Sequence, residues 1–358
     1  MPASPITTLT DRRVLNKLVN KRIKPYTALT KLLFPPSVKE NLLEETAQVD
    51  VLEGTYGMAP FVKVGQKAII MDSQNGTSYT IDTPFINIKR PLQWSTKFAK
   101  RTAGQPVFTN TSIALQQVRD AITKDIDFMN TLIDDRIEWM AAYILRGTIE
   151  YSVEGQDSFV ISTGKPAINT FTVSALWDGG SAVPLEDIAD AKLVVSNKRG
   201  PLPNVAICGA GAGAALRGML EGDEVTSLKT TSGIDVGRAN LLSQIKEDGM
   251  MHIGFIGDVD FFQYTGTFNP DGGGAAEVLI RDDYVEFFNT GQRALDARRL
   301  MFGMIPDLRA ILEGNAITER YFDSKAPEFD QGTYEGLIMS RPFPWLYRPD
   351  WLVSMKVI

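Results

Sequence analysis

Residues 112–146, SIALQQVRDAITKDIDFMNTLIDDRIEWMAAYILR, form the most regular stretch of the sequence. Its apolar residues follow one another at steps of three or four: Val118, Ile122, Ile126, Met129, Ile133, Ile137, Met140 and Ile144. This spacing places them on one face of an α-helix. The stretch therefore predicts a single long helix over residues 112–146 that lies against a sheet. At about 1.5 Å per residue, its length is on the order of 50 Å.

The acidic residues of this stretch include two pairs, Asp125/Asp127 and Asp134/Asp135. Carboxylates bind metals, but neighbouring positions on a helix diverge by about 100°, so the members of a pair do not converge on one ion. We therefore interpret both pairs as a solvated face of the helix. Gly147 follows at the position where a left-handed residue commonly ends a helix.

The composition excludes several classes of site. The chain has 358 residues, which corresponds to two or three domains. Cys208 is the only cysteine and His252 the only histidine. An intrachain disulfide, a cysteine-based zinc or iron–sulfur site and a multi-histidine metal site are therefore excluded.

Charge and hydropathy argue against two kinds of partner. The net charge of −6 is unlike that of a general nucleic-acid binder, whose surface is basic. The N-terminus lacks the apolar centre of a secretory signal, and no stretch has the 18 or so apolar residues of a membrane span. We expect a protein that is made and kept in a reducing cytoplasm.

The charge is unevenly distributed. Residues 1–39 contain eight basic residues and one acidic residue, so they carry +7 and leave −13 on residues 40–358. Three interpretations are open: a basic helix on its own domain, a nucleic-acid-binding arm, and an arm that lies on the acidic body of a neighbouring copy. We favour the last, because complementary charge selects partners. Its candidate contact residues are Arg12, Arg13, Lys17, Lys21 and Arg22.

Residues 51–104 have the pattern of strands. Lys67–Met71 and Ser78–Ile81 flank Gln74-Asn75-Gly76, and Asn-Gly between two β-prone runs predicts a hairpin with a type I′ turn. The hairpin belongs either to a closed sheet or to a long loop that contacts another subunit, with Asn75, Gly76 and Tyr79 as candidate contacts. Pro84 and Pro91 bracket a further stretch, which we expect to be an edge strand.

A glycine-rich stretch is the one motif that suggests an enzyme. Residues 204–208 predict a buried strand, and Gly209-x-Gly211 follows it as in a dinucleotide-binding turn. No βαβ unit surrounds the motif, and the acidic residue expected about 20 positions later is missing. We therefore predict a close-packed turn from strand to helix. His252 lies in a predicted strand and lacks a catalytic partner at a recognised spacing, so we predict no catalytic residues, no metal, no cofactor and no enzymatic activity.

Several stretches, in this order along the chain, resemble the major capsid proteins of tailed bacteriophages with the HK97-type fold, in particular the lambda-type E family. They are Met58–Val62, Arg136–Ala142 with Leu145 and Gly147, Trp177, Pro184–Ile188, Tyr264-x-Gly266 and Ser340–Pro344. The stretch R-x-E-x-M-A-A-x-x-L-x-x-G, at residues 136–147, is the most specific of these.

The resemblance implies an α+β fold with an N-terminal arm, an extended β-ribbon called the E-loop, a long spine helix, and peripheral and axial domains. The expected segments are the arm (1–50), the E-loop ribbon with flanking strands (51–105), the peripheral domain with the spine helix (106–180), the axial domain (181–300) and C-terminal strands that return to the peripheral sheet (301–358).

The resemblance also implies the function and the partners. The chain is expected to assemble with itself into hexamers and pentamers, which form the icosahedral head around the double-stranded DNA of a tailed phage. Further expected partners are a portal and a decoration protein at threefold positions. A separate scaffolding protein is expected because the arm begins almost at Met1. DNA contacts are expected to be weak and nonspecific. The expected location is the virion, assembled in the host cytoplasm.

Two alternatives remain open from the sequence. The first is an encapsulin-type shell around an enzyme cargo, which has the same fold. The second is a nucleotide-dependent oxidoreductase.

Some relatives join an E-loop lysine covalently to an asparagine of another subunit, and Lys63 and Lys67 lie near the predicted ribbon. We identify neither the asparagine nor an activating carboxylate, so this chemistry is not predicted.

Overall fold

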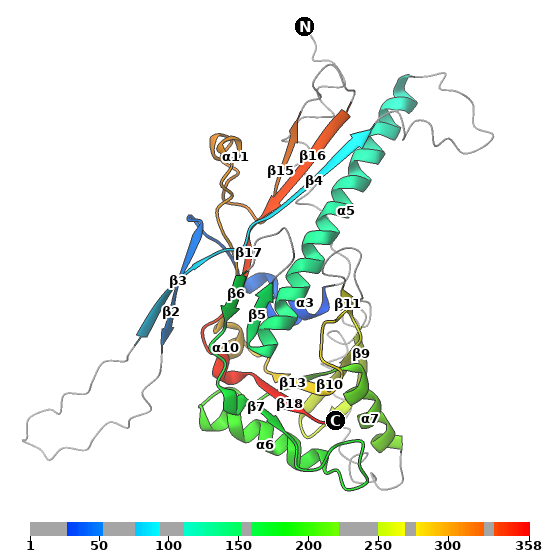
Figure 1. Ribbon diagram of the computed structural model, residues 1–358, viewed down its shortest axis with the longest axis vertical. Helices are drawn as coiled ribbons and strands as arrows, with labels where there is room; N and C mark the ends of the chain where they lie inside the picture. Colours follow the sequence, from blue (N-terminus) through cyan, green and yellow to red (C-terminus); the bar gives the residue numbers. More distant parts are fainter. Residues whose placement is uncertain are drawn as a thin grey trace, which may run out of the picture.

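The computed structural model describes residues 27–52, 76–93, 111–151, 159–221, 250–268, 277–325 and 333–358. It has one long helix, one six-stranded sheet and several smaller elements, which confirms the α+β class (Figure 1). The helices of the described residues are α3 (Ala28–Leu33), α5 (Thr111–Arg146), α6 (Pro184–Asn197), α7 (Ala210–Glu221), α10 (Gln292–Leu295) and α11 (Leu308–Leu312), with 3-10 helices η1 (Pro36–Val38), η2 (Ala167–Asn169) and η5 (Pro349–Trp351).

The six-stranded sheet forms the lower body of the molecule in Figure 1. Its strands in spatial order are β7 (Thr170–Thr172), β18 (Val353–Lys356), β13 (Tyr284–Phe288), β8 (Val205–Cys208), β10 (Val259–Tyr264) and β9 (Met250–Ile256). All four residues of β8 are buried, which confirms the strand predicted there. Successive side chains of a strand point to opposite faces, so Ala206 and Cys208 join one core while Val205 and Ile207 join another.

These two cores lie on the two faces of the sheet. Helices α6 and α7 cover one face, where Ile188 of α6 and Leu216 of α7 pack in the same cluster as Phe261 of β10. Helix α6 begins at Pro184, as predicted, with acidic residues in its first turn. The other face continues into the larger core around α5. The fold therefore joins the six-stranded sheet and the long helix through shared apolar residues.

Helix α5 confirms the predicted long helix to within one residue at its start. The apolar stripe from Ile122 to Ile144 is at most 3% exposed. It packs in one core with Phe322 and Ile338, which come from a three-stranded sheet of β15 (Tyr321–Lys325), β16 (Thr333–Ser340) and β4 (Ile86–Gln93). Gly147 ends the helix with the expected positive φ, +99°.

Smaller sheets complete the fold. They are β1 (Lys39–Asn41) with β14 (Arg298–Phe302) and β17 (Pro342–Leu346), β5 (Thr148–Tyr151) with β6 (Phe159–Ser162), and β11 (Thr267–Phe268) with β12 (Glu277–Val278). Among the described strands, β4 lies at the edge of its sheet, as expected for the stretch after Pro84, but it continues through Pro91 to Gln93.

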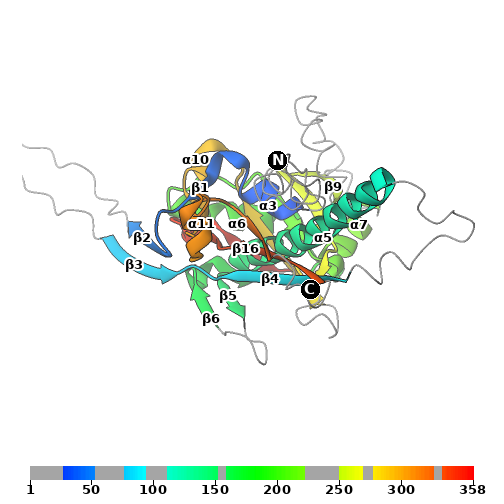
Figure 2. The same ribbon diagram turned by 90° about the horizontal axis from the view of Figure 1, so that it is seen from above.

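A two-stranded ribbon projects from the body. Strands β2 (Thr46–Leu52) and β3 (Gly76–Asp82) pair with each other and lead away from the other sheets, to the side opposite the far end of α5 (Figures 1 and 2). Strand β3 contains the second strand of the predicted hairpin and pairs with residues 46–52, while Lys67–Met71 and Asn75, the rest of the predicted hairpin, lie outside the described residues. Gly76 is the first residue of β3.

The N-terminal segment also departs from the sequence-based expectation. Residues 27–39 belong to the body, because Leu29, Leu33 and Phe34 are at most 1% exposed in the core of α5. Any arm that reaches a neighbouring copy is therefore confined to residues before Thr27. At the other end of the chain, β18 holds the terminus in the six-stranded sheet and not in the sheet of β15, β16 and β4. It pairs with β13, from the segment expected to be axial, and with β7.

Candidate functional site

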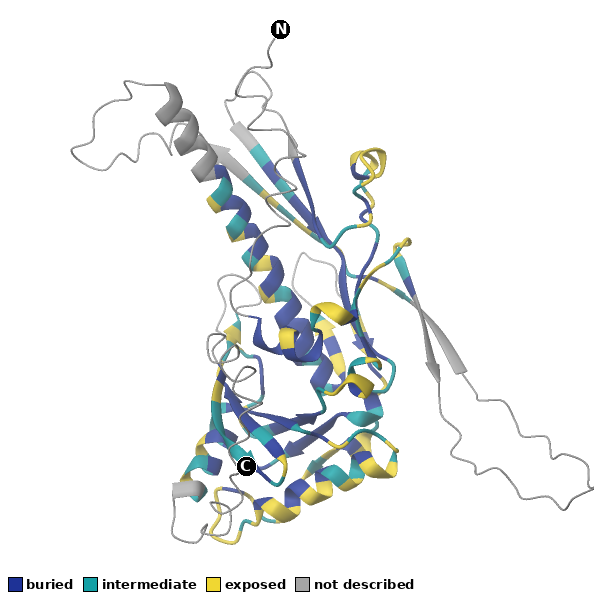
Figure 3. Cartoon of the chain, turned by 180° about the vertical axis from the view of Figure 1, so that it is seen from behind, coloured by how far each residue is buried: buried dark blue, intermediate teal, exposed yellow. Residues whose placement is uncertain are grey.

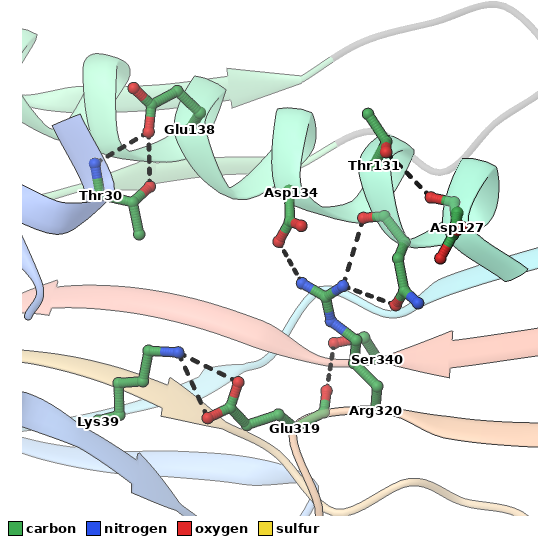
Figure 4. Close-up of polar contacts among 10 residues, drawn as sticks. Thr30, Lys39, Asp127, Thr131, Asp134, Glu138, Glu319, Arg320 and Ser340 are labelled. Carbon is green, nitrogen blue, oxygen red and sulfur yellow. Dashed lines mark hydrogen bonds and ion pairs between the residues drawn. The ribbon is translucent and has the colours of Figure 1, made fainter. Parts of the chain in front are cut away.

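The chain enters the described body through α3, and a buried carboxylate holds this entry point. Glu138 of α5 accepts a hydrogen bond from the backbone N–H group of Leu29 at 2.7 Å. It also accepts from the backbone N–H group and the hydroxyl of Thr30, at 2.9 and 2.8 Å (Figure 4). These N–H groups belong to the first turn of α3, where no preceding helical carbonyl can accept them. Thr27 makes no side-chain cap, so Glu138 replaces it from a distant element.

Glu138 also connects this entry point to the six-stranded sheet, because the Tyr264 hydroxyl of β10 donates to it at 3.2 Å. Burial raises the pKa of Glu138, while the bonds from Thr30, Leu29 and Tyr264 lower it in part. The carboxylate is 3% exposed, so its hydrogen-bond donors offset the cost of removing it from water.

The interpretation of the acidic pairs on α5 as a solvated face was wrong for two residues. Asp134 pairs with Arg320, which also donates to the Asn130 side chain at 2.7 Å (Figure 4), and Asp125 lies 3.4 Å from Arg90. Both aspartates are less than 5% exposed. Residues of the neighbouring sheet and loops cover the apolar stripe of α5 and also the helix positions beside it. Carboxylates at those positions are therefore buried against arginines.

A second junction fixes the root of the projecting ribbon. Arg341, between β16 and β17, donates to the backbone carbonyl of Thr83 at 3.0 and 3.3 Å and to the Glu45 carboxylate at 3.0 Å. Glu45 immediately precedes β2 and Thr83 immediately follows β3, so one guanidinium holds both strands at their base. The Thr83 hydroxyl donates to the Glu45 carbonyl at 2.7 Å and closes the root of the ribbon.

Close packing limits movement at this root. A Cβ on Gly303 would lie 2.4 Å from the Thr83 hydroxyl oxygen, and the Gly303 N–H donates to the Arg341 carbonyl at 2.9 Å. Arg341 is 8% exposed and Thr83 is 2% exposed. The base of the ribbon is therefore a packed part of the body, even though the strands lead away from it.

A buried ionic cluster joins the end of α5 to the six-stranded sheet. The Lys165 ammonium donates to the Leu145 carbonyl at 2.8 Å and to the Ser354 hydroxyl at 2.5 Å, and lies 3.8 Å from the Glu286 carboxylate. Burial lowers the pKa of Lys165 to about 8, against the opposing effect of Glu286. The cluster links three elements that are distant in sequence.

Most of the predicted contact residues lie outside the described residues. These are Arg12, Arg13, Lys17, Lys21, Arg22 and Asn75. Gly76 and Tyr79 lie in β3, opposite Leu52 and Val49 of β2. The structure therefore places Gly76 and Tyr79 on the projecting ribbon, and their contacts with another subunit stay a prediction.

Glu45 and Thr83, the two root residues that Arg341 binds, were not predicted from the sequence. Arg341 itself lies in the stretch Ser340–Pro344 that carries the family resemblance. Other residues of this resemblance contact one another: Tyr264 binds Glu138, and the Trp177 indole donates to Asp187 at 2.8 Å. Knowledge of which distant stretches pair would have identified these residues, but a single sequence does not show such pairings.

The glycine-rich turn is a packing device. A Cβ on Gly209 would lie 2.0 Å from the backbone oxygen of Arg281, so the turn from β8 to α7 needs glycine to approach the chain before β13.

His252 lies in β9, as predicted. Within the described part of the chain, no group of three or more His, Cys, Asp or Glu side chains gathers to hold a metal, and no helix is long and apolar enough to cross a membrane.

Comparisons with known proteins bear on the family. No curated protein matches the sequence. A crystal structure assigned to the capsid protein of a prophage of Escherichia coli CFT073 is 19% identical, with a TM-score of 0.70, and the match covers 97% of this chain and 99% of that one. A phage-related protein from Bordetella bronchiseptica RB50 is 12% identical, with a TM-score of 0.50, over 96% of both chains. These similarities confirm the HK97-type capsid fold.

The sequence itself matches the model of one family over nearly its whole length. This family is described as phage major capsid protein E, and the match covers residues 11–357. The match supports the head-protein prediction over the encapsulin and oxidoreductase alternatives, because the family consists of structural capsid proteins. The chain belongs to the phage major capsid protein E family.

Proposed function

We propose that copies of this chain assemble into hexamers and pentamers, which close into an icosahedral head around the double-stranded DNA genome of a tailed phage. The observation that carries the proposal is the projecting ribbon of β2 and β3, whose root Arg341 fixes to the body. An isolated two-stranded ribbon is marginally stable in water. A neighbouring copy supplies the surface on which it lies, and Gly76 and Tyr79 are its contact candidates in the described part.

The basic N-terminal residues are the second proposed contact. Arg12, Arg13, Lys17, Lys21 and Arg22 precede α3, which Glu138 anchors to the body. Residues 40–358 are acidic, so this segment finds opposite charge on a neighbouring copy. Closed symmetry then lets each copy use the same contacts without forming an open filament.

The domain division is part of the proposal. The long helix with its sheet of β15, β16 and β4 corresponds to the peripheral domain, and the six-stranded sheet with α6 and α7 corresponds to the axial domain. Strand β18 is assigned to the axial sheet because it pairs with β13.

Other partners follow from the same function. A scaffolding protein, a portal and a decoration protein at threefold positions are proposed for the head, which assembles in the host cytoplasm. The net negative charge of residues 40–358 suits a DNA container, because tight phosphate binding impedes packaging and ejection.

Sedimentation velocity and negative-stain electron microscopy of the full chain, with and without its scaffold, test the proposal. We expect capsomers, tubes or closed shells. A dispersed monomer under all assembly conditions contradicts it. Copurification of a ferritin-like or peroxidase cargo inside shells instead supports the encapsulin alternative.

A further inference from the structure

Residues 304–320 form a short projection that contains α11, and we call this projection the α11 knob. It carries a cluster of exposed apolar side chains. Leu308, Ile311 and Leu312 are 71, 48 and 78% exposed. Figure 3 shows this segment as an exposed hairpin that stands away from the buried body. Three large apolar side chains together on one turn of helix form a patch, unlike single exposed residues, which are normal on any protein surface.

The knob is an ordered structure. Asp307 caps α11 by accepting hydrogen bonds from the N–H groups of Arg309 and Ala310, at 2.8 and 3.0 Å. At the base, the Ile305 N–H donates to the Ala316 carbonyl at 3.0 Å, and Ile305, Ala310 and Ala316 share a small core with Tyr321 and Met339. The fold therefore holds the leucines in water at a fixed position.

The knob leaves the body from the same junction as the ribbon. The Met304 N–H donates to the Glu44 carbonyl at 3.0 Å, and Arg341 donates to the Met304 carbonyl at 3.5 Å as well as to Glu45. Leu43, beside this junction, is 73% exposed. The knob and the ribbon are thus held in a fixed relation where they leave the body.

We propose that the α11 knob packs against a second copy of this chain, the copy on which the ribbon lies. This inference rests on the proposed function. The knob and the ribbon leave the body at the same junction. A second copy that contacts the ribbon near this junction therefore also lies beside the knob. Size supports it too: three side chains fall far short of the ~800 Å² per partner of a stable interface, so the knob adds to another contact and does not form a dimer alone.

Substitution of the knob leucines tests this inference. The double variant Leu308→Ser/Leu312→Ser should keep the thermal unfolding temperature of the unassembled chain, because both side chains are already in water. We expect it to need at least a tenfold higher protein concentration to assemble. The matched control is Ile168→Ser, which changes a residue 69% exposed on η2, beside the six-stranded sheet. Equal effects of the two changes, or no effect of either, overturn the inference.

Cysteine labelling gives a second readout that does not depend on the double variant. Cys208 is buried and burial raises its pKa, so the native thiol is unreactive. A maleimide should label Leu312→Cys at least tenfold more slowly in assembled shells than in unassembled chain. Equal rates in wild-type-like shells overturn the inference and leave the proposed function intact. Failure of the wild-type chain to assemble overturns both. Protection that appears only when a different phage protein is added assigns the knob to that protein and also overturns the inference.

Discussion

At the scale of single residues, this fold depends on close approaches and buried charges that are remote in sequence. Gly209 allows the turn after β8 to touch the backbone before β13, and Lys165 joins α5 to β13 and β18. The sequence predicted the close-packed turn, because glycine and alanine follow a buried strand. It did not predict the burial of Asp134 or Glu138, because their arginine, hydroxyl and backbone partners lie on other elements.

Gly209→Ala tests the close approach. The added Cβ would overlap a backbone oxygen, which cannot turn away as a side chain does, so we expect the free energy of unfolding to fall by about 3 kcal/mol. Gly218→Ala is the matched control in α7, where a Cβ meets nothing within 4 Å. That change should leave stability unchanged or raise it by up to ~1 kcal/mol. Urea denaturation of the unassembled proteins measures both, and equal values contradict the account.

The pH dependence of unfolding tests the environment of Lys165. Its pKa is lowered to about 8 in the folded chain, while an unfolded lysine titrates near 10.4. Between these values the unfolded state binds more protons, so the contribution of Lys165 to the free energy of unfolding rises with pH and is lost as pH falls toward 8.

Lys165→Met removes this contribution. The stability of the wild type relative to the variant should increase by on the order of 1 kcal/mol per pH unit between about pH 8 and 10. Urea denaturation at several pH values measures the free energy of unfolding of both proteins. Other titrating groups affect both proteins equally, so their contributions cancel in the difference. A constant difference across this window shows that Lys165 is not titrating there.

At the scale of elements, the ribbon and the long helix differ in how well sequence predicts them. The helix follows from its own periodicity, so residues 112–146 predicted its extent. The ribbon joins β2 to β3 across residues 53–75, and a local turn signal at Asn75-Gly76 indicated a nearer partner. No local pattern in residues 46–52 points to residues 76–82, so this pairing was not predictable from one sequence.

Arg341→Lys tests the junction at the root of the ribbon. A lysine cannot bridge Thr83, Glu45 and Met304 at once, so we expect a loss of about 2 kcal/mol in the free energy of unfolding and a marked loss of assembly. Arg348→Lys is the matched control, because Arg348 pairs with Asp350, two residues away, at 2.9 Å. Light scattering follows assembly, and equal assembly of the two variants argues against a role for the junction.

At the scale of the whole molecule, we propose that the chain is a unit whose projecting ribbon and basic N-terminal segment are covered by other copies. The sequence predicted this from a family resemblance and from the uneven charge, and the family and fold are confirmed. The extent of the arm was predicted too generously. The basic charge of residues 1–39 runs continuously through Lys31 and Lys39, so charge alone did not show that the body begins at Thr27.

Removal of residues 1–26 tests the basic segment without disturbing the body. Glu138 and the apolar core still hold α3, so the truncated chain should keep its unfolding temperature and assemble poorly. A full-length variant with Arg12, Arg13, Lys17, Lys21 and Arg22 changed to Gln separates charge from chain length and should also assemble poorly at low salt. Normal assembly of the truncated chain contradicts the proposed contact.

Cryo-electron microscopy of the assembled particle tests the central claim most directly. The account predicts a closed shell of hexamers and pentamers in which β2 and β3 of each copy lie across a neighbouring copy. A particle in which each ribbon folds back on its own subunit, with no neighbour beneath it, contradicts the account.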